Sequence, residues 1–171
     1  MFLGMSNLVI LLKRCDVMLV HGFETAFGKI HAAEAEDKIT HIFLPGDILP
    51  VEMELQATPL LKETEQQIKA YLKGMLKTFS LPIDPHGTVF MKRVWEGLIN
   101  VPYGEVRSYA DIAEAIGAPK ACRAVGLANN RNPIPILIPC HRVVGKNGTL
   151  TGYRGGLDLK KALLDLEAAC K

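Results

Sequence analysis

The chain has 171 residues, of which 49% are hydrophobic and 22% are charged, and its net charge at pH 7 is +2. These values are ordinary for a folded globular protein and exclude a disordered or strongly charged chain. A net charge this small does not by itself indicate nucleic-acid binding, which would need a local basic patch. Residues 8–12 form an apolar run that is too short to span a membrane and that no basic residue precedes. We therefore expect no membrane span and no signal peptide, and a cytoplasmic location, or a nuclear one in a eukaryote.

Short apolar or alternating runs in the first half of the chain predict a sheet. The runs cover residues 8–12, 16–23, 29–33 and 38–44. A helix is predicted over residues 59–79, because apolar residues recur there at helical spacing and Thr58 can cap the first turn.

A segment rich in prolines and other breakers, residues 80–87, follows this helix and predicts a linker. We therefore divide the chain into an N-terminal α/β domain, residues 1–80, and a C-terminal domain, residues 81–171. The length of the chain suits either two small domains or one sizeable one.

Helical spacing returns in the second half of the chain. The predicted helices cover residues 88–100, 109–116, 120–128 and 158–169. Ser108 can cap the second of them, and Pro119 suits the start of the third. The second and third are short and joined by a turn containing Gly117, which is typical of a helix-turn-helix motif, although many such hairpins bind nothing.

The third predicted helix carries small residues, which permit either a close seat against DNA or close packing in a core. They are Ala121, Ala124, Gly126 and Ala128. Arg123 on this helix could contact DNA or form an exposed ion pair. Tyr109 lies on the apolar face of the preceding helix, so spacing alone predicts a core role for it.

A cysteine next to a histidine, Cys140-His141, follows the apolar run of residues 134–138. A thiol is nucleophilic only as thiolate, and an adjacent imidazole can take its proton. The alternative is a buried, inert cysteine. Side chains of neighbours in a strand point to opposite faces, so contact between the two would need a kink or a bridging water. Residues 143–150 predict a hairpin around Asn147-Gly148, and a loop follows over residues 153–156.

The cysteines show no C-x-x-C pair and no disulfide framework, which indicates free thiols. They are Cys15, Cys122, Cys140 and Cys170. Cys122 is expected to pack in the core. Candidate metal ligands in the first half lack the spacing of a zinc site, so no metal is predicted. They are Cys15, His21, His31 and His41.

Taken together, blocks between Leu81 and Glu167 resemble the O6-alkylguanine-DNA alkyltransferases, also called methylated-DNA–protein-cysteine methyltransferases. The blocks are Pro102-Tyr103-Gly104-Glu105-Val106, Arg123-Ala124-Val125-Gly126, Asn132-Pro133, Pro139-Cys140-His141-Arg142-Val143 and Tyr153-Arg154-Gly155-Gly156-Leu157. The resemblance implies an α+β fold. Its parts would be a small N-terminal antiparallel-sheet, ribonuclease-H-like domain and a mainly helical C-terminal domain with a helix-turn-helix of winged-helix type.

The resemblance implies direct-reversal DNA repair, in which an alkyl group moves irreversibly from O6 of guanine, with O4 of thymine as an alternative, to Cys140. One alkyl group would be taken per molecule, without a cofactor. The partner would be double-stranded DNA bound through the minor groove, with the damaged base turned out of the stack. A monomer is expected, with no membrane partner.

Residue roles follow from the resemblance by motif position. Arg123 would fill the space left in the base stack, with Ala124 and Gly126 on the surface that contacts DNA. Tyr109 would help to turn out the nucleotide and would then donate a proton to the leaving guanine. Asn132 would brace the turn between the recognition helix and an active-site strand.

The same resemblance assigns the chemistry and the base pocket. His141 would accept the thiol proton of Cys140 through a water, while Glu167 would hold the imidazole. On spacing alone, Glu167 is a solvated helix acid. The base pocket would be formed by Val143, Tyr153 and Arg154, with Arg154 acting through its backbone N–H.

Competing interpretations differ in what the thiol does. An alkyltransferase-like protein would bind alkylated DNA without repairing it, but such proteins lack the nucleophile that Cys140 supplies here. A DNA-binding regulator could use its cysteine to sense alkylation or oxidation, although no regulatory domain is visible. A thiol hydrolase would need an oxyanion site, which nothing in the sequence indicates.

Overall fold

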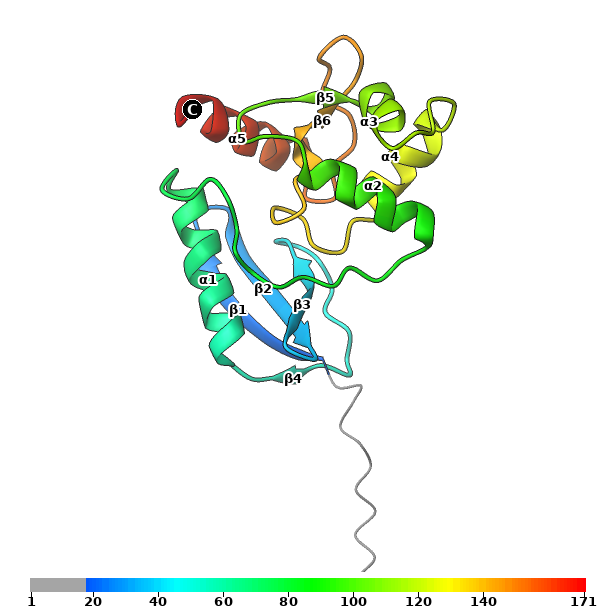
Figure 1. The fold of residues 1–171 in the computed structure, drawn as a ribbon. Coiled ribbons are helices and arrows are strands. Elements are labelled where there is room, and N and C mark those ends of the chain that lie inside the picture. The colour runs from blue at the N-terminus through cyan, green and yellow to red at the C-terminus, as the bar shows by residue number, and fades with distance from the viewer. Residues whose placement is uncertain (1–17) are drawn as a thin grey trace, which may run out of the picture.

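The computed structural model describes residues 18–171. The predicted strand over residues 8–12, the start of the next one and Cys15 lie outside this range. Within it, none of the helices has the length and apolar character that crossing a bilayer requires. The predicted α+β class, with an N-terminal sheet and a helical C-terminal region, is confirmed (Figure 1).

A four-stranded sheet forms the N-terminal part, in the order β3-β2-β1-β4. The strands are β1 (Leu19–Thr25), β2 (Gly28–Ala35), β3 (Lys38–Phe43) and β4 (Glu54–Leu55). The first three pair antiparallel, as predicted, but β4 runs parallel to β1, so the sheet is mixed. Glu36 and Asp37 both have positive φ, which gives the tight turn between β2 and β3 the twist that antiparallel neighbours require.

Helix α1 (Pro59–Leu72) packs against the sheet (Figure 1). Its predicted cap is confirmed, because Thr58 Oγ1 accepts from the Leu61 amide at 3.1 Å. The helix ends well before the predicted residue 79. The Gly74 amide donates to Tyr71 O, and the Met75 amide donates to Ala70 O. Gly74 adopts φ +70°, so the chain leaves the helix there while these two bonds satisfy its last carbonyls.

The predicted linker, residues 80–87, lies along the edge of β3. The Ile39 amide donates to Pro82 O at 2.8 Å, and the Asp84 amide donates to Ile39 O at 2.9 Å. One continuous core cluster joins residues of both parts of the chain, among them Ile39, Tyr71 and Trp95. The division at residue 80 remains a prediction, and the two parts pack as one body around that core.

The C-terminal part contains helices around a short parallel pair of strands (Figure 1). In chain order the elements are α2 (Val89–Ile99), β5 (Arg107–Ser108), α3 (Tyr109–Ala115), α4 (Cys122–Asn130), η1 (Cys140–Arg142), β6 (Val143–Val144) and α5 (Gly156–Ala169). The predicted cap of α3 is confirmed, and Ser108 and Asp111 form a reciprocal capping box.

Some predictions for this half need correction. Pro119 lies in the turn before α4, which begins at Cys122. The predicted hairpin over residues 143–150 is absent, because β6 pairs parallel with β5. Asn147-Gly148 does form a turn, in which the Gly145 amide bonds to Thr149 O at 2.8 Å. The predicted turn at Asn147-Gly148 is therefore confirmed, but the strand that pairs with β6 is β5, which lies far earlier in the chain.

Candidate active site

The turn that leads to Cys140 is buried throughout, and the side chain of Asn132 bridges it. Asn132 Nδ2 donates to Ile138 O at 2.9 Å, and its Oδ1 accepts from the Ile134 amide at 3.0 Å. Between these contacts Ile136 has φ +76°, a conformation that a β-branched residue adopts only when its surroundings enforce it. The segment is therefore a braced turn and not the strand that was expected.

Cys140 opens the short 3-10 helix η1 and is only 3% exposed. Its carbonyl accepts from Asn129 Nδ2 at 3.4 Å. Burial raises the pKa of the Cys140 thiol, and the Asn132 amide and the charge of Lys160 oppose that effect in part. The thiol is therefore protonated near neutral pH and needs a base before it can attack.

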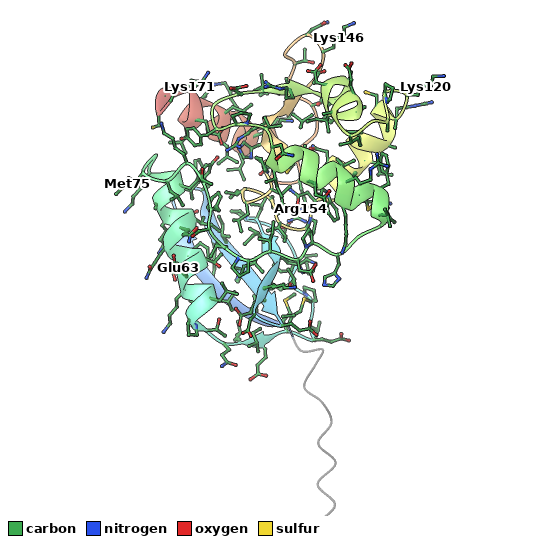
Figure 2. The ribbon with its side chains drawn as sticks, viewed as in Figure 1. Glu63, Met75, Lys120, Lys146, Arg154 and Lys171 are labelled. Atoms are coloured by element: carbon green, nitrogen blue, oxygen red, sulfur yellow. The ribbon has the colours of Figure 1, made fainter. Side chains whose placement is uncertain are left out.

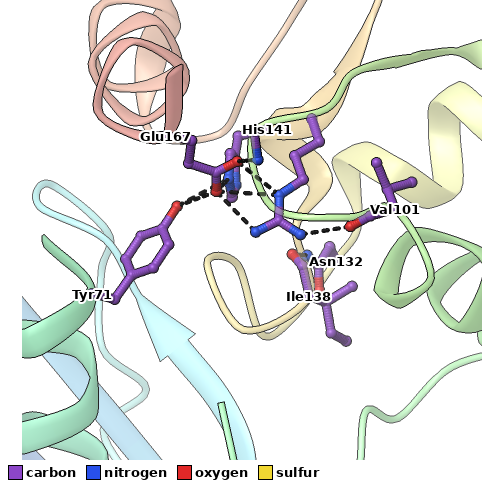
Figure 3. A network of polar contacts seen from close by, with 8 residues as sticks. Tyr71, Val101, Asn132, Ile138, His141 and Glu167 are labelled. Carbon is purple, nitrogen blue, oxygen red and sulfur yellow. Dashed lines mark hydrogen bonds and ion pairs between the residues drawn. The ribbon is translucent and has the colours of Figure 1, made fainter. Parts of the chain in front are cut away.

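His141 and Glu167 meet in the interior, although Glu167 lies on α5. His141 Nε2 is 2.9 Å from Glu167 Oε1, and neither residue is exposed (Figure 3). The expectation of a solvated helix acid is wrong, because packing of α5 against η1 buries this carboxylate. A buried carboxylate keeps its negative charge only where hydrogen-bond donors surround it.

Donors from several elements surround the Glu167 carboxylate (Figure 3). Arg142 Nε lies 3.1 Å from Oε1 and 3.0 Å from Oε2, and the Gly104 amide donates to Oε2 at 2.9 Å. Tyr71, on α1 of the N-terminal part, donates its hydroxyl to Oε1 at 2.6 Å. Burial alone would raise the pKa of Glu167, but hydrogen bonds from His141, Arg142 and Tyr71 hold it well below its usual range. The acid is therefore anionic.

Burial lowers the pKa of His141, and the neighbouring Glu167 only partly offsets this. A neutral imidazole facing a carboxylate places its proton on Nε2, the nitrogen that faces Glu167. Nδ1 is buried and has no hydrogen-bond partner among the described residues. His141 therefore presents one free, basic nitrogen within the site.

Lys160 and Tyr153 lie near Cys140. Lys160 is fully buried, and its Nζ donates to Val143 O at 2.6 Å and to Thr151 O at 2.9 Å. Burial and the adjacent Cys140 raise the pKa of Tyr153, which is 9% exposed. Tyr109 reaches this loop from α3, where its hydroxyl lies 2.8 Å from Thr151 Oγ1. Tyr109 is therefore tied to the site as well as packed against the core.

Arg154 connects the loop before α5 to the sheet and lies between the two parts of the chain (Figure 2). Its guanidinium donates to Ile42 O at 2.6 Å and to Asn132 O at 3.4 Å, and it pairs with Asp47 at 3.2 Å. The side chain therefore makes contacts in addition to the backbone N–H role that the resemblance implies. The side chain ties the candidate base pocket to the N-terminal sheet.

Helix α4 presents one face to solvent and packs the other against the core. Arg123 and Ala124 are exposed, whereas Val125, Ala128 and Asn129 face the core. Cys122 is exposed, so the expectation that it packs in the core is wrong. Its position at the first turn of a short helix places it on the outer face.

The residues considered as metal ligands that lie within the described range are His21, His31 and His41. No cluster of three or more His, Cys, Asp or Glu residues in that range could hold a metal ion. His21 lies instead 2.7 Å from Glu65 on α1.

The structure thus brings Cys140, His141, Glu167 and Asn132 into one buried cluster, with Arg123 on a separate exposed helix. Sequence reasoning missed several members of the cluster. They are Tyr71, Arg142, Gly104 and Lys160. Arg142 could have been found, because it lies inside the Cys-His block. Tyr71 gave no signal beyond its apolar helical spacing.

Comparison with known proteins gives matches over both parts of the chain. The ribonuclease-like domain of the 6-O-methylguanine DNA methyltransferases matches residues 18–85, and the DNA-binding domain of the same family matches residues 89–169. The constitutive methylated-DNA–protein-cysteine methyltransferase of Bacillus subtilis is 50% identical over 151 residues, which cover 84% of this chain and 92% of that protein.

A second relative and a solved structure extend this likeness. The methylated-DNA–protein-cysteine methyltransferase of Methanosarcina acetivorans is 48% identical over 86% of this chain and 97% of that protein. The crystal structure of Mycobacterium tuberculosis OGT in complex with DNA has a TM-score of 0.84 at 40% identity, and covers 89% of this chain and 94% of that one.

Proposed function

The chain belongs to the 6-O-methylguanine DNA methyltransferase family, and from this premise we propose that it repairs DNA by moving an alkyl group from O6 of guanine to Cys140. The observation that carries the assignment of residues is the buried Cys140-His141-Glu167 arrangement. In support of it, Cys140 and His141 are both buried and adjacent in the chain, and His141 Nε2 faces the Glu167 carboxylate at 2.9 Å.

The proposed reaction is a displacement at the alkyl carbon. His141 Nδ1 takes the proton of the Cys140 thiol through a water, and the resulting thiolate attacks the carbon on O6. The sulfur–carbon bond forms as the carbon–oxygen bond breaks, and the electron pair of that bond stays on the guanine. Glu167 stabilises the imidazolium that forms.

We assign the protonation of the leaving guanine to Tyr109. Its hydroxyl lies at the loop that Lys160 anchors, 2.8 Å from Thr151 Oγ1, so it reaches the site from the helix that precedes α4. The products are a neutral guanine and a thioether on Cys140. A thioether has no easy leaving group, so the protein would act once per molecule.

We propose that α3 and α4 form a helix-turn-helix of winged-helix type that binds DNA through the minor groove. Arg123 and the small Ala124 lie on the exposed face of α4, which suits close approach to a narrow groove. The damaged nucleotide would rotate into the pocket bounded by Val143, Tyr153 and Arg154, while Arg123 fills its place in the stack. In the N-terminal part, the sheet and α1 would form the ribonuclease-H-like domain.

Intact-protein mass spectrometry tests the proposal. The protein is incubated with a duplex carrying one O6-methylguanine, and each modified chain should gain one methyl group in place of a hydrogen, mapped to the Cys140 peptide. The gain should saturate at one per chain.

Two variants serve as controls. Cys140→Ala should abolish the gain while DNA affinity persists, and Cys122→Ala, which removes an exposed thiol, should leave the gain intact. Tight binding of the duplex without any mass change would favour a protein that binds alkylated DNA and does not repair it.

A further inference from the structure

One donor to the active-site carboxylate comes from the opposite part of the chain. Tyr71 lies in the last turn of α1, is fully buried, and has its hydroxyl 2.6 Å from Glu167 Oε1 and 3.2 Å from His141 Nε2 (Figure 3). The other contacts to the carboxylate come from the C-terminal part. The N-terminal part therefore reaches the reaction machinery through this hydroxyl.

The direction of these hydrogen bonds follows from the groups involved. An ionised carboxylate only accepts, so the Tyr71 hydroxyl must donate to Glu167. Burial and Glu167 raise the pKa of Tyr71, which keeps its proton in place. The Tyr71 oxygen can then accept from His141 Nε2, whose N–H lies between that oxygen and Glu167 Oε1. Both contacts demand the tautomer that carries the proton on Nε2.

The Tyr71 contact also changes how strongly Glu167 holds a proton on His141. A short hydrogen bond to a carboxylate takes up part of its charge, which leaves less for an adjacent imidazolium. Other ionisable groups act on His141 or Tyr71 as well. They are Arg142 on η1, Lys160 on α5, and Tyr103 in the loop between α2 and β5.

We infer that Tyr71 is a positioning residue for alkyl transfer, which fixes His141 in the tautomer whose Nδ1 accepts the Cys140 proton and weakens the hold of Glu167 on the resulting imidazolium. Its role in transfer rests on the function proposed above. Its effect on His141 does not, because that effect can be measured without substrate.

Tyr71→Phe in the full chain tests this inference, with Tyr103→Phe as the matched control. The Tyr103 hydroxyl is buried beside Tyr71 and has no partner among the described residues, so its removal leaves the carboxylate contacts unchanged. Two quantities are measured against pH: the titration of the His141 ring by NMR, and the rate of transfer from free O6-benzylguanine.

Tyr71→Phe should raise the pKa of His141 and move the acidic limb of the rate profile upward by about one pH unit, the size expected for losing one hydrogen bond to a charged group. Tyr103→Phe should match the wild type in both measurements. A lower melting temperature for Tyr71→Phe with an unchanged His141 titration would show a purely structural role and overturn the inference.

A measurement on the wild-type protein covers the case in which Tyr71→Phe does not fold. The hydroxyl proton of Tyr71 should be observable by NMR, with a nuclear Overhauser effect to the His141 ring, and that ring should carry its proton on Nε2. The opposite tautomer would overturn the inference. A shifted His141 titration in a protein that transfers no alkyl group would contradict the proposed function alone.

Discussion

Nε2 of His141 lies 2.9 Å from Oε1 of Glu167, and both side chains are shielded from solvent. The pair is part of a network in which Arg142 and Tyr71 also depend on the Glu167 carboxylate. Removing the charge of that carboxylate therefore affects the fold and the chemistry together.

Glu167→Gln should reduce the free energy of unfolding by about 3 kcal/mol, because it leaves the buried guanidinium of Arg142 without its counter-ion. It should also slow alkyl transfer by about 100-fold or more, since the imidazolium loses its stabilising charge. Denaturant unfolding and single-turnover kinetics measure the two effects. Asp165→Asn on the same helix removes an exposed partner of Lys161 and should change stability by less than about 0.5 kcal/mol.

Stability should fall as the pH drops below about 6.5, in part through His141. Burial lowers the pKa of this group in the fold, so between that lowered pKa and the unfolded value of 6.5 only the unfolded chain binds the proton. The stabilisation is thus fully present above the unfolded pKa and is lost as the pH falls toward the folded one. Urea midpoints at pH 7.5 and 5.5 measure the effect.

His141→Gln should flatten that dependence in part, because burial also lowers the pKa of His31 and His41, which titrate in the same direction. Equal slopes for wild type and His141→Gln would show that His141 is not held neutral by the fold.

Arg123→Ala should slow transfer from a duplex far more than transfer from free O6-benzylguanine, because only the duplex substrate requires a side chain to replace the extruded base. The ratio of the two rates is the quantity measured. Arg131→Ala, which removes an exposed charge at the other end of α4, should change that ratio much less. Equal losses on both substrates would argue against the intercalating role of Arg123.

Asn132→Ala should cost about 2 kcal/mol of stability, because it leaves the buried Ile138 carbonyl and Ile134 amide without partners. It should slow transfer as well, since the turn that sets Cys140 relaxes around the positive φ of Ile136. Thermal unfolding and alkylation rate are measured in parallel. Asn100→Ala, at an exposed position, should change stability by about 0.5 kcal/mol or less.

The sequence predicted correctly the helix caps, which depend only on residues close together in the chain. The caps at Thr58 and Ser108 are confirmed, because each side chain bonds an amide only three residues away. Helix α1 ends before the predicted residue 79, because Gly74 stops it although the apolar spacing continues past that glycine. The parallel pairing of β5 with β6 could not be predicted, since the two strands are far apart in the chain.

The sequence by itself indicated the proposed nucleophile and its proposed base, because Cys140 and His141 are adjacent and a thiol beside an imidazole suits nucleophilic chemistry. The tertiary structure decided which groups control them. Glu167 reaches His141 from α5 and Tyr71 reaches both from α1, over separations that no periodic pattern encodes. Tertiary packing also removes water from these groups, and that loss of solvation sets the charge state of each.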